Sequence, residues 1–295
     1  MTYGQGDYQY ELVENWGNLP EGYEWHQVAG VAVDSNDNVY AYNRSEHQLM
    51  IFDSDGNFLN TWDEVFAGPH GIHIGPDDSV YLADRDAHTV MKYSTGGTMT
   101  LKMGTGIPSE TGYTTNADPV PHAAGPFNLP TGIAVSDEGD IFISDGYGNA
   151  RVHRYTDTGS LLLSWGLPGK VNPGDFHLPH GIGIDHEGYV LVCDRENDRI
   201  QVFDQEGEFQ QMFDGVRQPT DLCVGPEGEI YVPELQGRVT IIDDEGNVLS
   251  QWGGERTHEA GQFWAPHGVA VDSRGDMYIG EVLDGMRLQK FARVR

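Results

Sequence analysis

The chain repeats itself six times, and this internal repeat limits the fold more than any other feature. Each copy begins with an apolar run, continues through a turn rich in Asp, Gly and Asn, and enters a second apolar run, which is typical of a β-hairpin. A third alternating run and a fourth that ends near Trp-Gly complete a unit of about 40–50 residues, the pattern of a β-propeller blade. The six first runs begin at Gly30, His70, Thr131, His180, Thr220 and His267.

The two ends of the chain predict how the repeat closes. The sixth unit runs out of sequence after Phe291 with only three strand-like runs, whereas Tyr10–Gly17 matches the missing fourth run. We therefore expect an all-β, six-bladed β-propeller in which the N-terminal strand completes the last blade. The 39 glycines and 15 prolines suit a chain made of strands and turns. We predict a single domain over residues 1–295 and a monomeric protein.

The charge of the chain bears on its partners. The sequence has 46 acidic against 17 basic residues, a formal net charge of −29, which argues against nucleic acid or an anionic membrane as a partner. Residues Met1–Asp7 have neither the basic start nor the apolar core of a signal peptide, and no membrane span is predicted. Cys193 and Cys223 lie inside apolar runs and are interpreted as buried free thiols, as in a reducing compartment. These features predict a cytoplasmic location.

The tripeptide Pro-His-Gly occurs at His70, His180 and His267, each time at the start of a first run. The first strand of a propeller blade lines the central axis, so we expect these histidines of blades two, four and six to face one another. Three imidazoles around an open coordination position are the ligand set of a catalytic zinc ion, and they would also accept another divalent metal. For any one of these histidines alone, the alternative is a hydrogen-bonded channel residue.

A second constellation follows the second run of each unit. An acid or amide stands there in all six copies, which a structural role in capping the turn into the third run explains. Arg44, Arg85 and Arg195 come next in three copies and predict an anionic substrate, because a guanidinium binds carboxylates; pairing with a neighbouring acid is the alternative. Tyr147 takes the arginine's place in the third blade. Near a metal and arginines a phenol can have a lowered pKa and accept a proton, although a lone tyrosine also suits packing.

Four segments make the chain similar to a known enzyme family. They resemble peptidyl-α-hydroxyglycine α-amidating lyases, which are six-bladed propellers of NHL repeats, and the likeness extends over nearly the whole chain. The resemblance implies a zinc-dependent lyase that cleaves the N–C bond of a carbinolamide, an α-hydroxyglycine, to an amide and glyoxylate. It implies His70, His180 and His267 as zinc ligands, Tyr147 as the base, and Arg44 and Arg195 as active-site arginines. The four segments are Ser144–Arg151, Ser164–Gly166, Leu178–Gly181 and Asp194–Gln201.

Two positions depart from that family. Gly268 stands where the family has an aspartate that helps to hold a structural calcium ion, so this ion is doubtful here. Arg85 is an additional cation, and we expect it to bind substrate together with Arg44 and Arg195. The predicted substrate is small and anionic or peptide-like, carries a carboxylate, and yields an oxo acid such as glyoxylate.

Two other functions stay open at this point. Some six-bladed propellers are metal-dependent hydrolases or lactonases acting on small anionic substrates, although those usually bind calcium through Glu, Asp and Asn. Other NHL propellers are scaffolds without catalytic activity, and a scaffold has no need of three channel histidines. The longest stretch without strand pattern, Gly104–Asn128, is interpreted either as a lid over the site or as a surface loop.

Overall fold

The computed structural model describes all 295 residues, which form β-strands and connecting turns with one short 3-10 helix, η1 (Arg195–Asn197). The chain divides into two compact units, and each contains three blades. One unit is Phe66–Pro219; the other combines Met1–Val65 with Thr220–Arg295. The predicted all-β, six-bladed β-propeller is confirmed, whereas the single domain over residues 1–295 stays a prediction.

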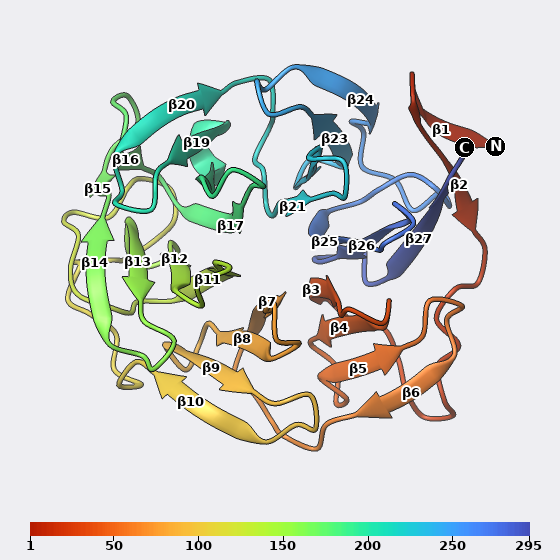
Figure 1. Ribbon diagram of the computed structural model, residues 1–295, viewed down its shortest axis with the longest axis horizontal. Helices are drawn as coiled ribbons and strands as arrows, with labels where there is room; N and C mark the ends of the chain where they lie inside the picture. Colours follow the sequence, from red (N-terminus) through yellow and green to blue (C-terminus); the bar gives the residue numbers. More distant parts are fainter. The chain divides into compact units, whose positions relative to one another are not determined.

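The unit Phe66–Pro219 contains blades two, three and four, each made of four consecutive antiparallel strands (Figure 1). Blade two consists of β7 (Pro69–Ile74), β8 (Val80–Asp84), β9 (Thr89–Tyr93) and β10 (Met99–Met103). Blade three consists of β11 (Pro130–Val135), β12 (Ile141–Asp145), β13 (Arg151–Tyr155) and β14 (Leu161–Trp165). Blade four consists of β17 (Pro179–Ile184), β18 (Val190–Asp194), β19 (Arg199–Phe203) and β20 (Phe209–Phe213). Between blades three and four the chain forms a short parallel pair, β15 (Leu167–Pro168) and β16 (Asp175–Phe176).

The other unit contains blades one, five and six. Blade one consists of β3 (Val28–Val33), β4 (Val39–Asn43), β5 (Leu49–Phe52) and β6 (Phe58–Thr61). Blade five consists of β21 (Cys223–Val224), β22 (Ile230–Glu234), β23 (Arg238–Ile242) and β24 (Val248–Gly253). Blade six consists of β25 (Pro266–Val271), β26 (Met277–Glu281), β27 (Leu288–Arg293), β2 (Tyr8–Val13) and β1 (Thr2–Gln5). Both cysteines are free, and no helix is long and apolar enough to cross a membrane.

The N-terminal strand completes blade six, as the sequence predicts. Strand β2 pairs antiparallel with β27, and Leu12 lies opposite Phe291. Tyr10 fixes this strand in the core, because its hydroxyl lies 2.9 Å from that of Tyr231 and its ring stacks on Trp252 with centroids 5.7 Å apart. Strand β1 then adds a fifth strand at the outside, which the repeat does not predict.

The tryptophan near the end of the fourth strand joins one blade to the next. Trp165 of β14 packs against Phe142 in its own blade and against Phe203 in blade four, with ring centroids 6.3 Å and 5.8 Å away. Trp252 of β24 makes the matching contact with Phe291 of blade six at 5.7 Å. The repeated Trp-Gly is therefore a packing feature, since large aromatic side chains bury the apolar surface between adjacent sheets.

The acid or amide after the second strand holds the loop that enters the first strand of the same blade. Asp84 accepts hydrogen bonds from the backbone N–H groups of Ala67 and Gly68, both at 2.8 Å, and from that of Ala87 in the following turn. Asp194 accepts from the backbone N–H of His177 at 2.8 Å in the same way. The predicted capping role thus extends to a second loop, and the two loops meet at one end of the blade. We call this the site end: the end where the first strand begins and the second strand ends.

Candidate active site

His70 and His180 are the second residues of β7 and β17, at the site ends of blades two and four. Each stands in a β-bulge, because the pairing register shifts after Pro69 in blade two and after Pro179 in blade four. A bulge redirects the side chains that it contains. Both imidazoles are buried, with 1% of each residue exposed.

The glycine after His70, and the matching glycine of blade three, are required by the neighbouring blade. A Cβ atom added to Gly71 would lie 2.4 Å from the carbonyl oxygen of Thr131. In blade three the matching residue is Gly132, where an added Cβ would lie 2.7 Å from the carbonyl oxygen of His180. In the Pro-His-Gly motif of blade two, the histidine is therefore followed by a glycine that leaves room for the first strand of the neighbouring blade.

Blade three holds both histidines in place. His70 Nδ1 lies 2.8 Å from the carbonyl oxygen of Thr131. Because that oxygen can only accept, Nδ1 carries the proton and Nε2 keeps its lone pair. Ser144 Oγ donates a hydrogen bond to the carbonyl oxygen of His180 at 2.5 Å. The hydroxyl of Thr131 donates to the carbonyl oxygen of Pro179 at 2.9 Å. The two imidazole rings lie with their centroids 4.8 Å apart.

Tyr147 brings its phenol oxygen to both histidines. Its Oη lies 3.4 Å from His70 Nε2 and 3.3 Å from His180 Nε2. Arg195 Nη1 donates a hydrogen bond to the same oxygen at 3.1 Å. One oxygen atom is thus in reach of two imidazoles and a guanidinium, and these four predicted site residues do come together.

Two guanidinium groups flank the ring of Tyr147. Arg85 Cζ lies 5.3 Å and Arg195 Cζ 5.1 Å from the ring centroid, within the range of cation–π contacts. Each arginine also pairs with the acid that follows it, Asp86 at 2.7 Å and Glu196 at 2.9 Å. Arg85 and Arg195 thus each pair with a neighbouring acid, as the alternative interpretation expects, and each also contacts Tyr147. The side chain of Arg85 is 27% exposed and that of Arg195 only 8%.

The loop that presents Tyr147 has close neighbours on both sides. A Cβ atom at Gly146 would lie 1.8 Å from the carbonyl oxygen of Pro179, which directly precedes a site histidine. A Cβ atom at Gly148 would lie 2.2 Å from Asn128 Oδ1. Neither glycine can be replaced without moving its neighbour, so the position of the phenol is fixed by backbone packing.

The long segment Gly104–Asn128 supports that loop. Thr111 Oγ1 donates to the carbonyl oxygen of Gly148 at 2.5 Å, and Gly148 N–H donates to the carbonyl oxygen of Asn128 at 2.9 Å. Asn128 N–H in turn donates to Asp145 at 2.9 Å. Thr111 and Asn128 of this segment are thus both hydrogen-bonded to Gly148 of the Tyr147 loop. These bonds favour a supporting loop over a lid.

We expect Gly146→Ala to lower the free energy of unfolding by about 1–3 kcal/mol, because the added methyl group overlaps the carbonyl of Pro179. Urea unfolding measures this change. Gly125→Ala is the matched control, since a Cβ there meets nothing within 4 Å, and it should stay within about 0.5 kcal/mol of the parent. Equal stability of the two variants would contradict the close packing of the Tyr147 loop.

His267 and Arg44 lie in the unit with blades one, five and six. His267 is the second residue of β25 and is 4% exposed. Its Nδ1 lies 2.6 Å from the carbonyl oxygen of Ala29, the matching residue of blade one, so its Nε2 also keeps the lone pair. Arg44 follows β4, and its Nη1 donates to Gln27 Oε1 at 2.8 Å. His267 therefore repeats the contact that His70 makes with Thr131.

Asp221 is a carboxylate outside the predicted site, although the repeat contains a signal for it. The other five copies have glycine at this position, and blade five alone has an acid. Burial raises the pKa of Asp221 to about 7, and the backbone N–H of Val269 donates to its Oδ2 at 3.3 Å. Val269 directly follows Gly268, the position at which the resembling family has an aspartate that helps to hold calcium. The side chain of Asp221 therefore lies beside this position. The doubt about calcium stays a prediction.

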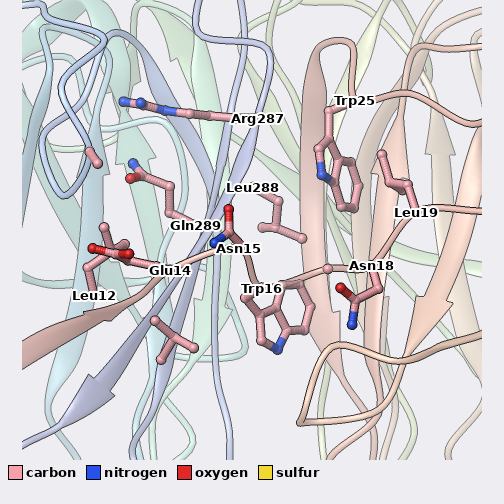
Figure 2. A pocket seen from close by; sticks show the side chains of 13 residues that line it. Leu12, Glu14, Asn15, Trp16, Asn18, Leu19, Trp25, Arg287, Leu288 and Gln289 are labelled. Atoms are coloured by element: carbon pink, nitrogen blue, oxygen red, sulfur yellow. The ribbon is translucent and has the colours of Figure 1, made fainter.

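A cavity of about 730 Å³ lies beside the N-terminal strand β2 in the unit with blades one, five and six (Figure 2). Two of its polar side chains already have protein partners: Arg287 pairs with Glu281, and Gln289 Nε2 donates to the carbonyl oxygen of Gln262 at 3.0 Å. None of the predicted site residues lines this cavity. Its walls consist of Leu12, Val13, Glu14, Asn15, Trp16, Gly17, Asn18, Leu19, Trp25, Ala260, Arg287, Leu288 and Gln289.

Comparison with known proteins agrees with the fold. Residues 127–155 and 176–203 match the NHL repeat family, so fold and repeats together define an NHL-repeat β-propeller. The chain belongs to the family of NHL repeat-containing protein 3. The human member is 31% identical over 308 residues, which cover 96% of this chain and 84% of the human protein.

The predicted resemblance to the amidating lyases is also confirmed. Peptidyl-α-hydroxyglycine α-amidating lyase 1 of Drosophila melanogaster is 29% identical over 93% of this chain, and the match spans 55% of the fly protein. The chain thus spans about half the length of this curated relative. Among solved structures, virginiamycin B lyase from Staphylococcus aureus has a TM-score of 0.65 at 12% identity, covering 97% of this chain and 100% of that chain, which supports the fold alone.

Proposed function

We propose that the chain is a metal-dependent lyase that breaks the N–C bond of a carboxylate-bearing carbinolamide, giving an amide and an oxo acid such as glyoxylate. The observation that carries this proposal is the position of Tyr147 Oη, which reaches Nε2 of His70, Nε2 of His180 and the guanidinium of Arg195. The homology to the amidating lyases supports the same class of reaction.

His70, His180 and His267 would hold the metal, and zinc is the ion we expect. All three are buried, and the Nδ1 atoms of His70 and His267 are bound to backbone carbonyls, as metal-binding histidines usually are. In the neutral imidazoles of His70 and His267, Nε2 would then be the ligand atom. A divalent cation bound there would supply Lewis acidity to an oxygen of the substrate.

Tyr147 is the proposed base. It would accept the proton of the carbinol hydroxyl, and the electron pair of that O–H bond would form the carbonyl of the oxo acid. The C–N bond then breaks with its electron pair going to nitrogen, which takes up a proton and leaves as the amide. The reaction consumes neither water nor an oxidant. Arg195, which donates to Tyr147 Oη, would favour the ionised phenol.

The arginines are proposed to bind the carboxylate of the substrate. Arg85 is the more exposed of the two that flank Tyr147, so it suits a direct contact, while Arg195 also fixes the phenol. Arg44 is proposed as a third contact from blade one. A guanidinium offers two parallel N–H donors to a carboxylate, which orients the substrate as well as binding it.

The test is to incubate the zinc-loaded protein with N-acyl-α-hydroxyglycines and to measure glyoxylate and amide. We expect the two products in equal amounts. The same assay on ureidoglycolate-like compounds shows which groups the protein accepts on the amide nitrogen. Absence of glyoxylate from every carbinolamide would contradict the proposal. Hydrolysis of small lactones in parallel assays would instead favour the hydrolase alternative.

A further inference from the structure

The residue that follows the acid or amide at the site end differs in kind between the blades. It is Arg44, Arg85 or Arg195 in blades one, two and four, whereas it is Leu235 in blade five and Val282 in blade six. These two apolar residues stand at positions that match those of the arginines. The site ends of blades five and six therefore have apolar side chains where those of blades one, two and four have cations.

Leu235 and Val282 belong to one apolar cluster with Ala29, Trp264 and Ala265, which we call the apolar patch. The patch lies next to His267. Ala29 provides the carbonyl oxygen that His267 Nδ1 contacts at 2.6 Å, and Val282 N–H donates to the carbonyl oxygen of Ala265 at 3.0 Å, two residues before this histidine. Ala29, Ala265 and Val282 are buried, while Leu235 and Trp264 are partly exposed.

Trp264 has a fixed place in this patch. Its backbone N–H donates to Glu281 Oε2 at 2.6 Å, and its ring stacks on His258 with centroids 4.5 Å apart and planes within 12°. Leu235 is fixed through its backbone, because Arg256 Nη2 donates to its carbonyl oxygen at 3.0 Å. The partly exposed members of the patch are thus held by their neighbours before any ligand binds.

The turn after Val282 adds exposed apolar surface to blade six. Leu283 is 43% exposed and Met286 is 38% exposed. Both have left-handed backbone conformations, with φ of +55° and +43°, which residues with large side chains rarely adopt. Strain of this kind persists where the surrounding structure imposes it and is common at ligand sites. Leu283 and Met286 thus add exposed apolar surface in the turn that directly follows Val282 of the apolar patch.

We propose that the apolar patch binds the acyl group on the amide nitrogen of the substrate and that this group is aliphatic or aromatic. The inference rests on the proposed function, which places a metal at His267 and the substrate carboxylate at the arginines. The side chains of Leu235 and Val282 offer a carboxylate no hydrogen-bond donor in exchange for its hydration, so the patch suits the uncharged end of the carbinolamide. The chain is thus expected to prefer hydrophobic N-acyl-α-hydroxyglycines over the acetyl compound.

The experiment compares N-acetyl- and N-hexanoyl-α-hydroxyglycine as substrates of the zinc-loaded protein. We expect kcat/KM to be about 16- to 250-fold higher for the hexanoyl compound, mainly through KM, because each of its four additional methylenes contributes about a two- to fourfold gain when buried. Leu235→Ser should remove most of this preference, because it should lower kcat/KM for the hexanoyl compound far more than kcat/KM for the acetyl compound.

Leu161→Ser is the matched control, because Leu161 is 47% exposed on the outer strand β14 of blade three. Calorimetric titration with hexanamide and acetamide provides a readout that needs no turnover. Turnover without dependence on acyl length would overturn the apolar patch and leave the lyase standing. Preferential binding of hexanamide that Leu235→Ser abolishes, with no turnover of any substrate, would support the patch and overturn the lyase. Equal binding of the two amides would overturn the patch in either case.

Discussion

Tyr147→Phe should lower kcat for carbinolamide cleavage by about 10²- to 10⁴-fold while the protein keeps its metal. The substitution removes only the oxygen atom that lies 3.4 Å and 3.3 Å from the Nε2 atoms of His70 and His180. The ring would still pack between Arg85 and Arg195, so we expect the folded structure to survive. Steady-state kinetics and zinc content, measured on the same preparation, check this result.

Tyr189→Phe is the matched control for that substitution, because Tyr189 is a partly buried tyrosine at the other end of blade four. It should leave kcat within about twofold of the parent, as expected of a substitution away from the site. An unchanged kcat in Tyr147→Phe would remove the tyrosine from the mechanism and leave another group to take the hydroxyl proton.

His180→Ala should lose the bound metal and the activity together. We expect about one zinc ion per chain in the parent protein and a loss of about 10³-fold or more in kcat/KM when one of three ligands is removed. Treatment of the parent with a chelator should have the same effect, and added zinc should restore the activity of the parent but not of the variant. Elemental analysis of the purified proteins gives the metal content directly.

His186→Ala serves as the control for this experiment, because His186 is an exposed histidine in the same blade. It should keep both metal and activity. A parent protein that is free of metal, inactive on every carbinolamide and as stable as a zinc-treated sample would favour the scaffold function instead. Metal that remains bound in His180→Ala would show that the ligand set differs from the three histidines.

Much of the fold could be predicted because its signals are local. Alternating apolar residues and turns rich in Asp, Gly and Asn recur in each unit, and a terminal Trp-Gly recurs in some of them, so blade number and strand order follow from the sequence. The clasp of β2 on β27 was predictable from a count of strand-like runs. The fifth strand β1 was not, because Thr2–Gln5 is a short polar segment whose pairing with β2 depends on the strand already in place.

The site was predictable in its residue types and less so in its geometry. His70, His180, Tyr147, Arg85 and Arg195 stand at positions that the repeat marks, and they meet in the unit Phe66–Pro219. The support that Thr111 and Asn128 give to the Tyr147 loop was not predictable, because Gly104–Asn128 has no repeat pattern. Asp221 is an acid at a position where the other five copies have glycine, but only the structure shows that it is buried.

The sequence by itself determined the blade, its number and the kinds of side chain at each matched position, since these depend on a short period of apolar residues and turns. Only the tertiary structure decided which atoms meet. His70 and Tyr147 are 77 residues apart, and their contact depends on how blades two and three pack. The apolar patch likewise joins Ala29 to Val282 through the pairing of blades one and six. Contacts of this kind arise from packing between sheets, which no local pattern encodes.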